Sequence, residues 1–429
     1  MAPKATSLFD IHYSIFTIPY LASLTMPFLK KTALIIGLIV LLAVIKIVLN
    51  SISPSSVVFH RNLLTGLQWL LFLGLIWWLL LQLLGRVAGK KGFPLWLSWV
   101  IFIVVMGIGE WGTYYLMQHA DGVSKRIHGY LLKYYVLFER PLPEVRPDCA
   151  QYDPQLTYIY KPDAAALQKA PEFSDTLRFN KAGLRDDEIS LTAPQVICLG
   201  DSYTMGVGVG QQQTYAQVLE KKTGLKVLNA GVSSYGTVRE LMLYRRLDTS
   251  AMQYLVLQYC FNDLEENLAY LRNGRKLSVR SKQAYDTLVN AHYWATFYYP
   301  LKRVLTISRM MVKSIFTQEA VQTPKPNPML STTASNAFLD ILYHSGIDFN
   351  RTRVLVVDIS KYPTFDVQRV VQSAAYSDVF KKSLRFINVA PLDEPSLFYP
   401  LDNHLNAEGH AVLADVIQQE ILRDSNTVR

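Results

Sequence analysis

Residues 196–210 of this 429-residue chain read VICLGDSYTMGVGVG and carry the strongest structural signal in the sequence. The first four are apolar, as expected for a strand that is buried on both faces. Gly200 and Asp201 then turn the chain, and Ser202 opens a helical pattern. In a parallel sheet such a turn lies beyond the carboxyl end of a strand, where ligands bind. The pattern therefore predicts that Ser202 is exposed at a ligand-binding edge.

Short β-branched runs alternate with helical patterns on both sides of this stretch. The strand-like runs after it are KVLNAG, YLVLQYCFND, RVLVVDIS and SLRFINVA, and the helical ones include TYAQVLEKKTG, TVRELMLYRRL and AEGHAVLADVIQQEIL. This alternation is typical of a sheet covered by helices on both faces. We therefore expect residues 195–429 to form a doubly wound, mostly parallel α/β domain of flavodoxin-like type.

The position of Ser202 suggests nucleophilic chemistry. A serine hydroxyl is a weak nucleophile alone, but at a strand-to-helix turn it can meet a base while backbone N–H groups face a developing negative charge. The alternative is that Ser202 merely caps the following helix, which serine does well.

Two later strand ends bring hydrogen-bond donors to the same edge. VLNAGVSSYG places Gly231 there, where a backbone N–H can approach a substrate oxygen because no side chain intervenes. LQYCFND places Asn262 there, and its side-chain amide can donate as well. With the N–H of Ser202 these groups form an expected oxyanion hole. A turn glycine and a turn-forming asparagine are the alternatives.

The segment YPLDNHLNAEGH supplies a base near the C-terminus. His404 follows Asp402 by two residues on a loop before the last helix. An aspartate there can accept a hydrogen bond from one ring nitrogen and leave the other free to take the serine proton. His410 is the competitor, but it lies inside the helical pattern and reads as a helix-face residue.

Together these blocks resemble the SGNH, or GDSL, hydrolase superfamily. GDS, NAG, FND and DNH occur in the family's order and correspond to Ser202, Gly231, Asn262 and the pair Asp402 and His404. The resemblance implies a Ser-His-Asp acyl-enzyme mechanism. The commonest pattern has the aspartate three residues before the histidine, where this chain has Leu401; the two-residue spacing is similar to branches that include envelope polysaccharide acetyltransferases.

A further stretch, RFNKAGLRDDE at residues 178–188, resembles a segment that precedes GDS in many envelope-anchored relatives. Asn180 and Arg185 are the polar residues of interest in it. A structural loop and the rim of the site are the two roles left open for them.

The first quarter of the chain is strongly apolar. Thr32–Leu49, Leu63–Leu84 and Phe93–Met117 are each long enough to cross a hydrocarbon core of about 30 Å. We therefore expect residues 1–117 to form a membrane region with about three transmembrane helices. A removable signal peptide is the alternative for the first, although NSISPSSVV lacks a small-residue cleavage pattern.

Basic residues predict the orientation of these helices, because positive charge is retained on the cytoplasmic side. Lys30 and Lys31 precede the first helix, and Arg86, Lys90 and Lys91 lie between the second and third. An odd number of spans then places the rest of the chain outside, which in a bacterium is the periplasmic side of the inner membrane. An apolar run at residues 13–28 is short for a fourth span, and Met26 resembles a start of its own, so residues 1–25 stay unassigned.

The remaining divisions are a connecting segment, residues 118–194, and an insertion at about 267–350 that interrupts the strand–helix alternation. Within the insertion, residues 301–316 have an amphipathic pattern and TPKPNPML reads as an irregular loop. The amphipathic helix is expected to pack on its own domain, with a place on the membrane surface or over the active site as alternatives.

Composition excludes several other functions. The net charge of +9 owes much to the loop lysines and arginines, and no basic stripe interleaved with aromatics predicts nucleic-acid binding. Cys149, Cys198 and Cys260 are too few and too irregular for a disulfide framework or a zinc site. No metal or organic cofactor is expected.

We therefore expect a membrane-anchored serine esterase or O-acyltransferase. Its expected substrates are ester-linked acyl groups of envelope carbohydrate, with acetyl as the leading candidate. A lipase or lysophospholipase and a catalytically silent carbohydrate-binding subunit of an envelope assembly are the alternatives.

Overall fold

The computed structural model describes residues 30–45, 47, 57–87, 94–317, 328–359, 367–373 and 375–427. The chain divides into two compact units. Unit 1 contains the described residues up to Glu110 together with Tyr299–Arg309, and unit 2 contains Trp111–Tyr298 and the described residues from Met310 onward.

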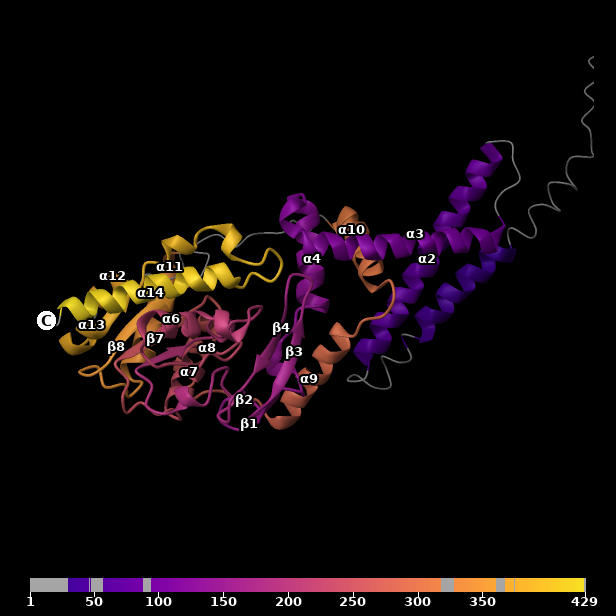
Figure 1. The fold of residues 1–429 in the computed structure, drawn as a ribbon. Coiled ribbons are helices and arrows are strands. Elements are labelled where there is room, and N and C mark those ends of the chain that lie inside the picture. The colour runs from indigo at the N-terminus through magenta and orange to yellow at the C-terminus, as the bar shows by residue number, and fades with distance from the viewer. Residues whose placement is uncertain are drawn as a thin grey trace, which may run out of the picture. The chain divides into compact units, whose positions relative to one another are not determined.

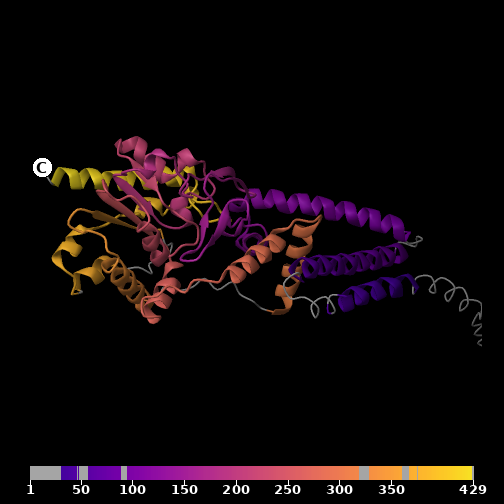
Figure 2. The ribbon, with the colours of Figure 1, turned by 90° about the horizontal axis from the view of Figure 1, so that it is seen from below.

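Unit 1 is helical. Residues 30–45 form a helix, followed by α2 (Val57–Val87) and α3 (Leu95–Gln118), the last of which continues into unit 2. Ile35 packs against Leu75 and Trp78, and Figure 2 shows the first helix running alongside α2. The expected first span, Thr32–Leu49, falls partly outside the described residues.

Two helices of unit 1 are long and apolar enough to cross a membrane: Leu63–Gly85 and Leu95–Gln118. Only 17% and 22% of their most apolar windows is buried. The core helix of a soluble protein would be mostly covered, whereas these helices expose large side chains such as Leu83, Trp96 and Ile108.

The amphipathic segment forms α10 (Lys302–Thr317). In unit 1 its Leu305 packs with Phe102 and Met106 of α3. The carboxylate of Glu110 accepts a hydrogen bond from the backbone N–H of Val304 at 2.9 Å, which satisfies one of the open donors at the start of the helix.

A five-stranded parallel sheet is the centre of unit 2 (Figure 1). Its strands are β5 (Val196–Leu199), β6 (Val227–Asn229), β7 (Tyr254–Tyr259), β8 (Arg353–Asp358) and β9 (Leu384–Phe386). They lie in the order β6-β5-β7-β8-β9, and every neighbouring pair is parallel. In chain order this is 2-1-3-4-5, the flavodoxin-like doubly wound arrangement. The predicted fold class and all five strands are confirmed.

Helices cover both faces of the sheet. On one face α6 (Tyr215–Thr223) and α14 (Ala407–Thr427) pack together and share a core with the inward side chains of β5 and β7. On the other face α7 (Thr237–Tyr244), α8 (Asp263–Arg272) and α11 (Pro328–Tyr343) contact one another, and Phe338 of α11 meets the ring of Tyr259 edge-on. Because both faces are covered, β5 and β7 are buried along their whole length.

Residues 118–194, expected as a connection, form folded elements of unit 2. They contain α4 (Lys125–Phe138) and two antiparallel hairpins, β1–β2 (Ala150–Asp153 and Thr157–Tyr160) and β3–β4 (Ala165–Lys169 and Ser174–Arg178). The short 3₁₀ helices of unit 2 are Ala120–Gly122, Pro143–Val145, Ile189–Leu191, Gln211–Gln213, Ala390–Leu392 and Pro395–Leu397.

The region expected as an insertion is largely helical. Between β7 and β8 it contains most of α8, α9 (Lys282–Thr296), α10 and α11. In Figure 1 α9 lies beside the β1–β2 hairpin, where the rings of Tyr285 and Tyr152 are 6.1 Å apart. Part of TPKPNPML lies outside the described residues, and its Pro328 begins α11. After β8 come α12 (Val367–Ser373) and α13 (Asp378–Ser383), then β9 and finally α14.

Candidate active site

Ser202 is the first residue of α5 (Ser202–Met205), directly beyond the carboxyl end of β5. The cap of this helix is Asp201, whose side chain accepts a hydrogen bond from the N–H of Tyr203 at 3.0 Å. Ser202 is therefore not the N-cap, and its hydroxyl is free for another role. Gly200 makes the tight turn possible, because an added Cβ would come within 2.1 Å of the Thr204 hydroxyl.

His404 lies over Ser202. Its Nε2 is 2.6 Å from the Ser202 Oγ, and its Nδ1 contacts Oδ1 of Asp402. The ring packs against that of Tyr203, with centroids 4.9 Å apart, and only 4% of the residue is exposed. The structure thus brings Ser202, His404 and Asp402, expected as a triad, into one hydrogen-bonded chain.

Two residues from the segment before the sheet contact Asp402, and sequence reasoning missed both. The buried Tyr135 of α4 donates its hydroxyl to Oδ2 of Asp402, and the Arg140 guanidinium lies 3.7 Å from the same oxygen. Burial alone would raise the pKa of Asp402, but the charge and hydrogen bond of His404, with Arg140 and Tyr135, hold it at about 2. Asp402 is therefore ionised at every physiological pH.

Glu172 holds the loop that carries Asp402. Its carboxylate accepts hydrogen bonds from the backbone N–H groups of Leu401 and Asp402, at 2.9 Å in each case. Burial raises the pKa of Glu172 to about 7, although these two N–H groups lower it and the Asp402 charge raises it further. The loop itself turns at Asn403, whose φ of 70° lies in the left-handed region that asparagine tolerates.

Gly231 lies at the carboxyl end of β6 as expected, but its backbone N–H donates to Oδ1 of Asn229 at 3.1 Å. The expected role of Gly231 as an oxyanion donor stays a prediction. The structure gives a different reason for glycine at this position: an added Cβ would come within 2.3 Å of the backbone nitrogen of Met205. The glycine lets the end of β6 pack directly on the helix that begins with Ser202.

Ser234, three residues later, is another candidate for a backbone donor. It is exposed and has a φ of 59°, a strained conformation for serine of the kind often found at functional sites. In the described part of the chain its N–H has no hydrogen-bonding partner, whereas the N–H groups of Ser233 and Tyr235 are bonded. The only sequence signal was the run of small residues in GVSSYG.

Asn262 follows β7 at the same edge and is exposed. Its side-chain Nδ2 is 3.4 Å from Oδ2 of Asp201, the neighbour of Ser202. At 3.4 Å this is a long hydrogen bond, so Asp201 holds the amide only weakly.

The other singled-out residues have structural roles. Arg185 is fully buried, pairs with Asp175 at 3.0 Å and donates to the Met205 carbonyl at 3.1 Å, so that it holds the loop after α5. Asn180 accepts from N–H groups of its own loop. His410 is buried on α14 and accepts from the N–H of Tyr215 at 3.2 Å; burial lowers its pKa to about 3. It does not reach Ser202 by any described contact.

No family model matches the sequence, and no curated protein matches it. Among solved structures, a protein described as lipolytic and of the G-D-S-L family from Desulfitobacterium hafniense is similar over 52% of this chain and 97% of its own, with 10% identity and a TM-score of 0.23. That score is too low to support a structural argument. The five-stranded parallel sheet with its 2-1-3-4-5 order is itself consistent with the SGNH fold.

Proposed function

We propose that this chain is a membrane-anchored serine esterase or O-acyltransferase that acts on acyl groups of envelope carbohydrate. The observation that carries the proposal is the chain of contacts from Ser202 Oγ through His404 to Asp402, with 2.6 Å between Ser202 Oγ and His404 Nε2. Few arrangements other than nucleophilic catalysis need a serine hydroxyl at hydrogen-bonding distance from a histidine that an ionised carboxylate orients.

The proposed first step is attack of Ser202 Oγ on the ester carbonyl carbon, while His404 Nε2 takes the hydroxyl proton. The carbonyl oxygen gains negative charge, for which the N–H groups of Ser202 and Gly231 and the amide of Asn262 are the candidate donors, with the N–H of Ser234 as a further candidate. Collapse of this intermediate expels the alcohol, which takes the proton from His404, and leaves an acyl-serine. Water or a second hydroxyl then attacks the acyl carbon and loses its proton to His404, which passes the proton to Ser202 Oγ as the bond between that oxygen and the acyl carbon breaks.

Membrane anchoring is part of the proposal. Its support is the pair of long apolar helices, Leu63–Gly85 and Leu95–Gln118, with their exposed apolar side chains. Basic residues in the short joints favour a cytoplasmic N-terminal side, as set out from the sequence. The catalytic unit would then act in the periplasm, on the outer side of a bacterial inner membrane.

The test of the mechanism is substitution of the serine and the histidine in the full-length protein. Ser202→Ala and His404→Ala should each remove nearly all turnover of 4-nitrophenyl acetate, because triad members act as one unit. His410→Ala is not a suitable control because it is buried, so the exposed His344→Ala, which should keep full activity, serves instead. Retention of most of the rate by Ser202→Ala would refute the mechanism.

The test of the substrate class is a series of 4-nitrophenyl esters of increasing acyl length, with and without oligosaccharide acceptors. Acetyl and propionyl esters should be preferred over decanoyl ones. Preference for long chains would favour a lipase, and appearance of acylated oligosaccharide in place of free acid would identify a transferase.

A further inference from the structure

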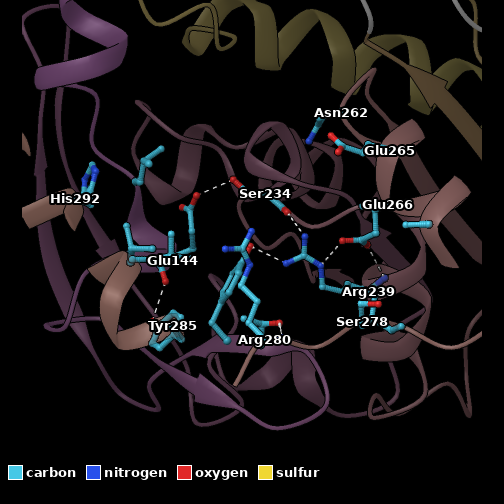
Figure 3. A pocket seen from close by; sticks show the side chains of 18 of the residues that line it. Glu144, Ser234, Arg239, Asn262, Glu265, Glu266, Ser278, Arg280, Tyr285 and His292 are labelled. Carbon is cyan, nitrogen blue, oxygen red and sulfur yellow. Dashed lines mark hydrogen bonds and ion pairs between the residues drawn. The ribbon is translucent and has the colours of Figure 1, made fainter. Parts of the chain in front are cut away.

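A cavity of about 830 Å³ lies in unit 2, and Asn262, a candidate oxyanion donor, is one of its lining residues (Figure 3). It reaches from Asn262 and Ser234 to the side chains of α9, and its size is in the range of cavities that hold small-molecule ligands. Asn262, which lines it, lies 3.4 Å from Asp201 through its amide nitrogen, so the cavity opens next to the residue before Ser202. None of the steps proposed above uses its deeper part.

Glu144 is the most informative group in the cavity. Only 6% of it is exposed, and one carboxylate oxygen accepts a hydrogen bond from the Ser234 hydroxyl at 2.7 Å. Its other oxygen, Oε2, is buried and has no hydrogen-bonding partner among the described residues. A buried acceptor without a hydrogen-bonding partner is unfavourable, so a ligand that donates a hydrogen bond there would be favoured.

A second polar wall is formed by Arg239. Its Nε pairs with Glu266 at 2.6 Å, one of its terminal nitrogens donates to the Tyr158 hydroxyl at 3.1 Å, and its guanidinium lies over the Tyr158 ring. Figure 3 shows Arg239 and Glu266 facing each other below Ser234. Because Arg239 is fixed from several sides, this wall is rigid and its polar groups are prearranged.

The opposite wall comes from α9 and is less polar, with Leu288, Ala291 and Ala295 among its residues. Tyr285 of the same helix is anchored by a hydrogen bond from its hydroxyl to the Glu144 carbonyl at 2.9 Å. A sugar ring has matching surfaces, since hydroxyls line its edge and C–H groups cover its faces. A long acyl chain would bury apolar surface against the open oxygen of Glu144, which is unfavourable.

We propose that this cavity is a glycan subsite, which binds an uncharged, hydroxyl-rich sugar chain beside Ser202, with a sugar hydroxyl donating to Glu144 Oε2. The role of this subsite in catalysis rests on the proposed function, whereas glycan binding by the cavity does not. It assigns the carbohydrate specificity to Glu144, in the segment before the parallel sheet, and to α9.

Binding can be measured without turnover. The full-length Ser202→Ala protein, in lipid nanodiscs, is titrated calorimetrically with cellohexaose, chitohexaose and mannohexaose, and in parallel with sodium decanoate. At least one hexasaccharide should bind with a Kd below about 1 mM. Binding of decanoate with no hexasaccharide bound, or no binding of any probe, would overturn the inference.

Three second substitutions then locate the site. Glu144→Gln keeps the shape and an acceptor for Ser234 but replaces the open oxygen by a donor, and it should weaken glycan binding at least 10-fold. Ala291→Trp should weaken it as much by filling the cavity. Ala284→Trp places the same ring on the exposed side of α9 and should leave the Kd unchanged. Equal affinities in all three would place the glycan elsewhere and refute the subsite.

Failure of this inference differs from failure of the proposed function. Wild-type protein that hydrolyses 4-nitrophenyl acetate while its Ser202→Ala form binds no hexasaccharide would refute the glycan subsite alone. Glycan binding that depends on Glu144 and Ala291, in a protein without esterase activity, would support the subsite and refute the catalytic proposal.

Discussion

The hydroxyl of Tyr135 donates a hydrogen bond to the carboxylate of Asp402, a residue 267 positions later in the chain. Tyr135 lies on α4, before the first strand of either hairpin, whereas Asp402 lies just before the last helix. The candidate triad therefore depends on a part of the chain that contributes no strand to the parallel sheet.

Replacing Tyr135 by phenylalanine removes this donor and keeps the ring. A hydrogen bond to a charged group contributes about 1.5–3 kcal/mol, so kcat should fall about 10- to 150-fold. The pKa of Asp402, which burial tends to raise and which His404, Arg140 and Tyr135 together hold at about 2, should rise, and activity should be lost at a higher pH on the acid side. The measurement is kcat/KM against pH.

The matched control is Tyr134→Phe. Tyr134 is the adjacent buried tyrosine, but its hydroxyl donates to Glu139 instead, at 3.1 Å. Its loss should leave the pH profile unchanged. Equal effects of the two substitutions would mean that Tyr135 acts only through the stability of α4.

Asn262→Ala tests the oxyanion assignment. Removal of one side-chain donor commonly lowers the rate constant about 10²- to 10³-fold, and the loss should appear in kcat more than in KM. Asn273→Ala, at the other end of α8, removes an amide that only bonds the Lys276 carbonyl and should have no effect on kcat. An unchanged kcat in Asn262→Ala would mean that Asn262 is only a turn residue.

Glu172 predicts a pH dependence of stability. Burial raises its pKa from 4.5 to about 7, so between these values the unfolded chain has released a proton that the folded protein retains. Stability therefore decreases as pH rises from about 4.5 to 7. Glu172→Gln removes this contribution, and its Tm relative to wild type should increase between pH 5 and pH 8.

Glu188→Gln is the control for that experiment, because Glu188 also accepts a backbone N–H, from Lys181 at 2.9 Å, but is exposed. Its Tm difference from wild type should be the same at both pH values. If the Glu172→Gln difference is also constant, the loop does not depend on the ionisation of Glu172.

Membrane orientation is open to a direct test. A reporter that is active only in the cytoplasm should be inactive when fused after Arg429 and active when inserted in the Arg86–Lys91 joint. This follows from the lysines and arginines on the N-terminal side and in that joint. An active C-terminal fusion would show that the catalytic unit faces the cytoplasm.

The sheet could be predicted from the sequence because its signal is local. Strands buried on both faces are mostly apolar runs, so VICL and YLVLQY predicted β5 and β7 without any knowledge of the strands that pair with them. Ser202 and His404 could also be predicted, because each lies in a short motif whose place is defined by the strand pattern.

Residues that act through contacts with distant parts of the sequence could not be predicted in this way. Tyr135 occurs in an aromatic-rich helix with nothing local to relate it to Asp402, and Glu172 contacts a loop 229 residues away. The packing reason for Gly231 was hidden for a related reason. A glycine at a strand end can serve a ligand, a close backbone contact or both, and the close approach of the Met205 backbone nitrogen is visible only in the fold.

The contacts of Asp402 also define the smallest fragment that can work. A truncation that starts at the parallel sheet, near residue 195, would keep Ser202, Asn262, Asp402 and His404 and would satisfy every sequence motif. It would nevertheless leave the buried carboxylate of Asp402 without Tyr135 and Arg140, and its loop without Glu172. An active soluble form would have to begin before α4, and inactivity of a shorter one would say nothing about the nucleophile.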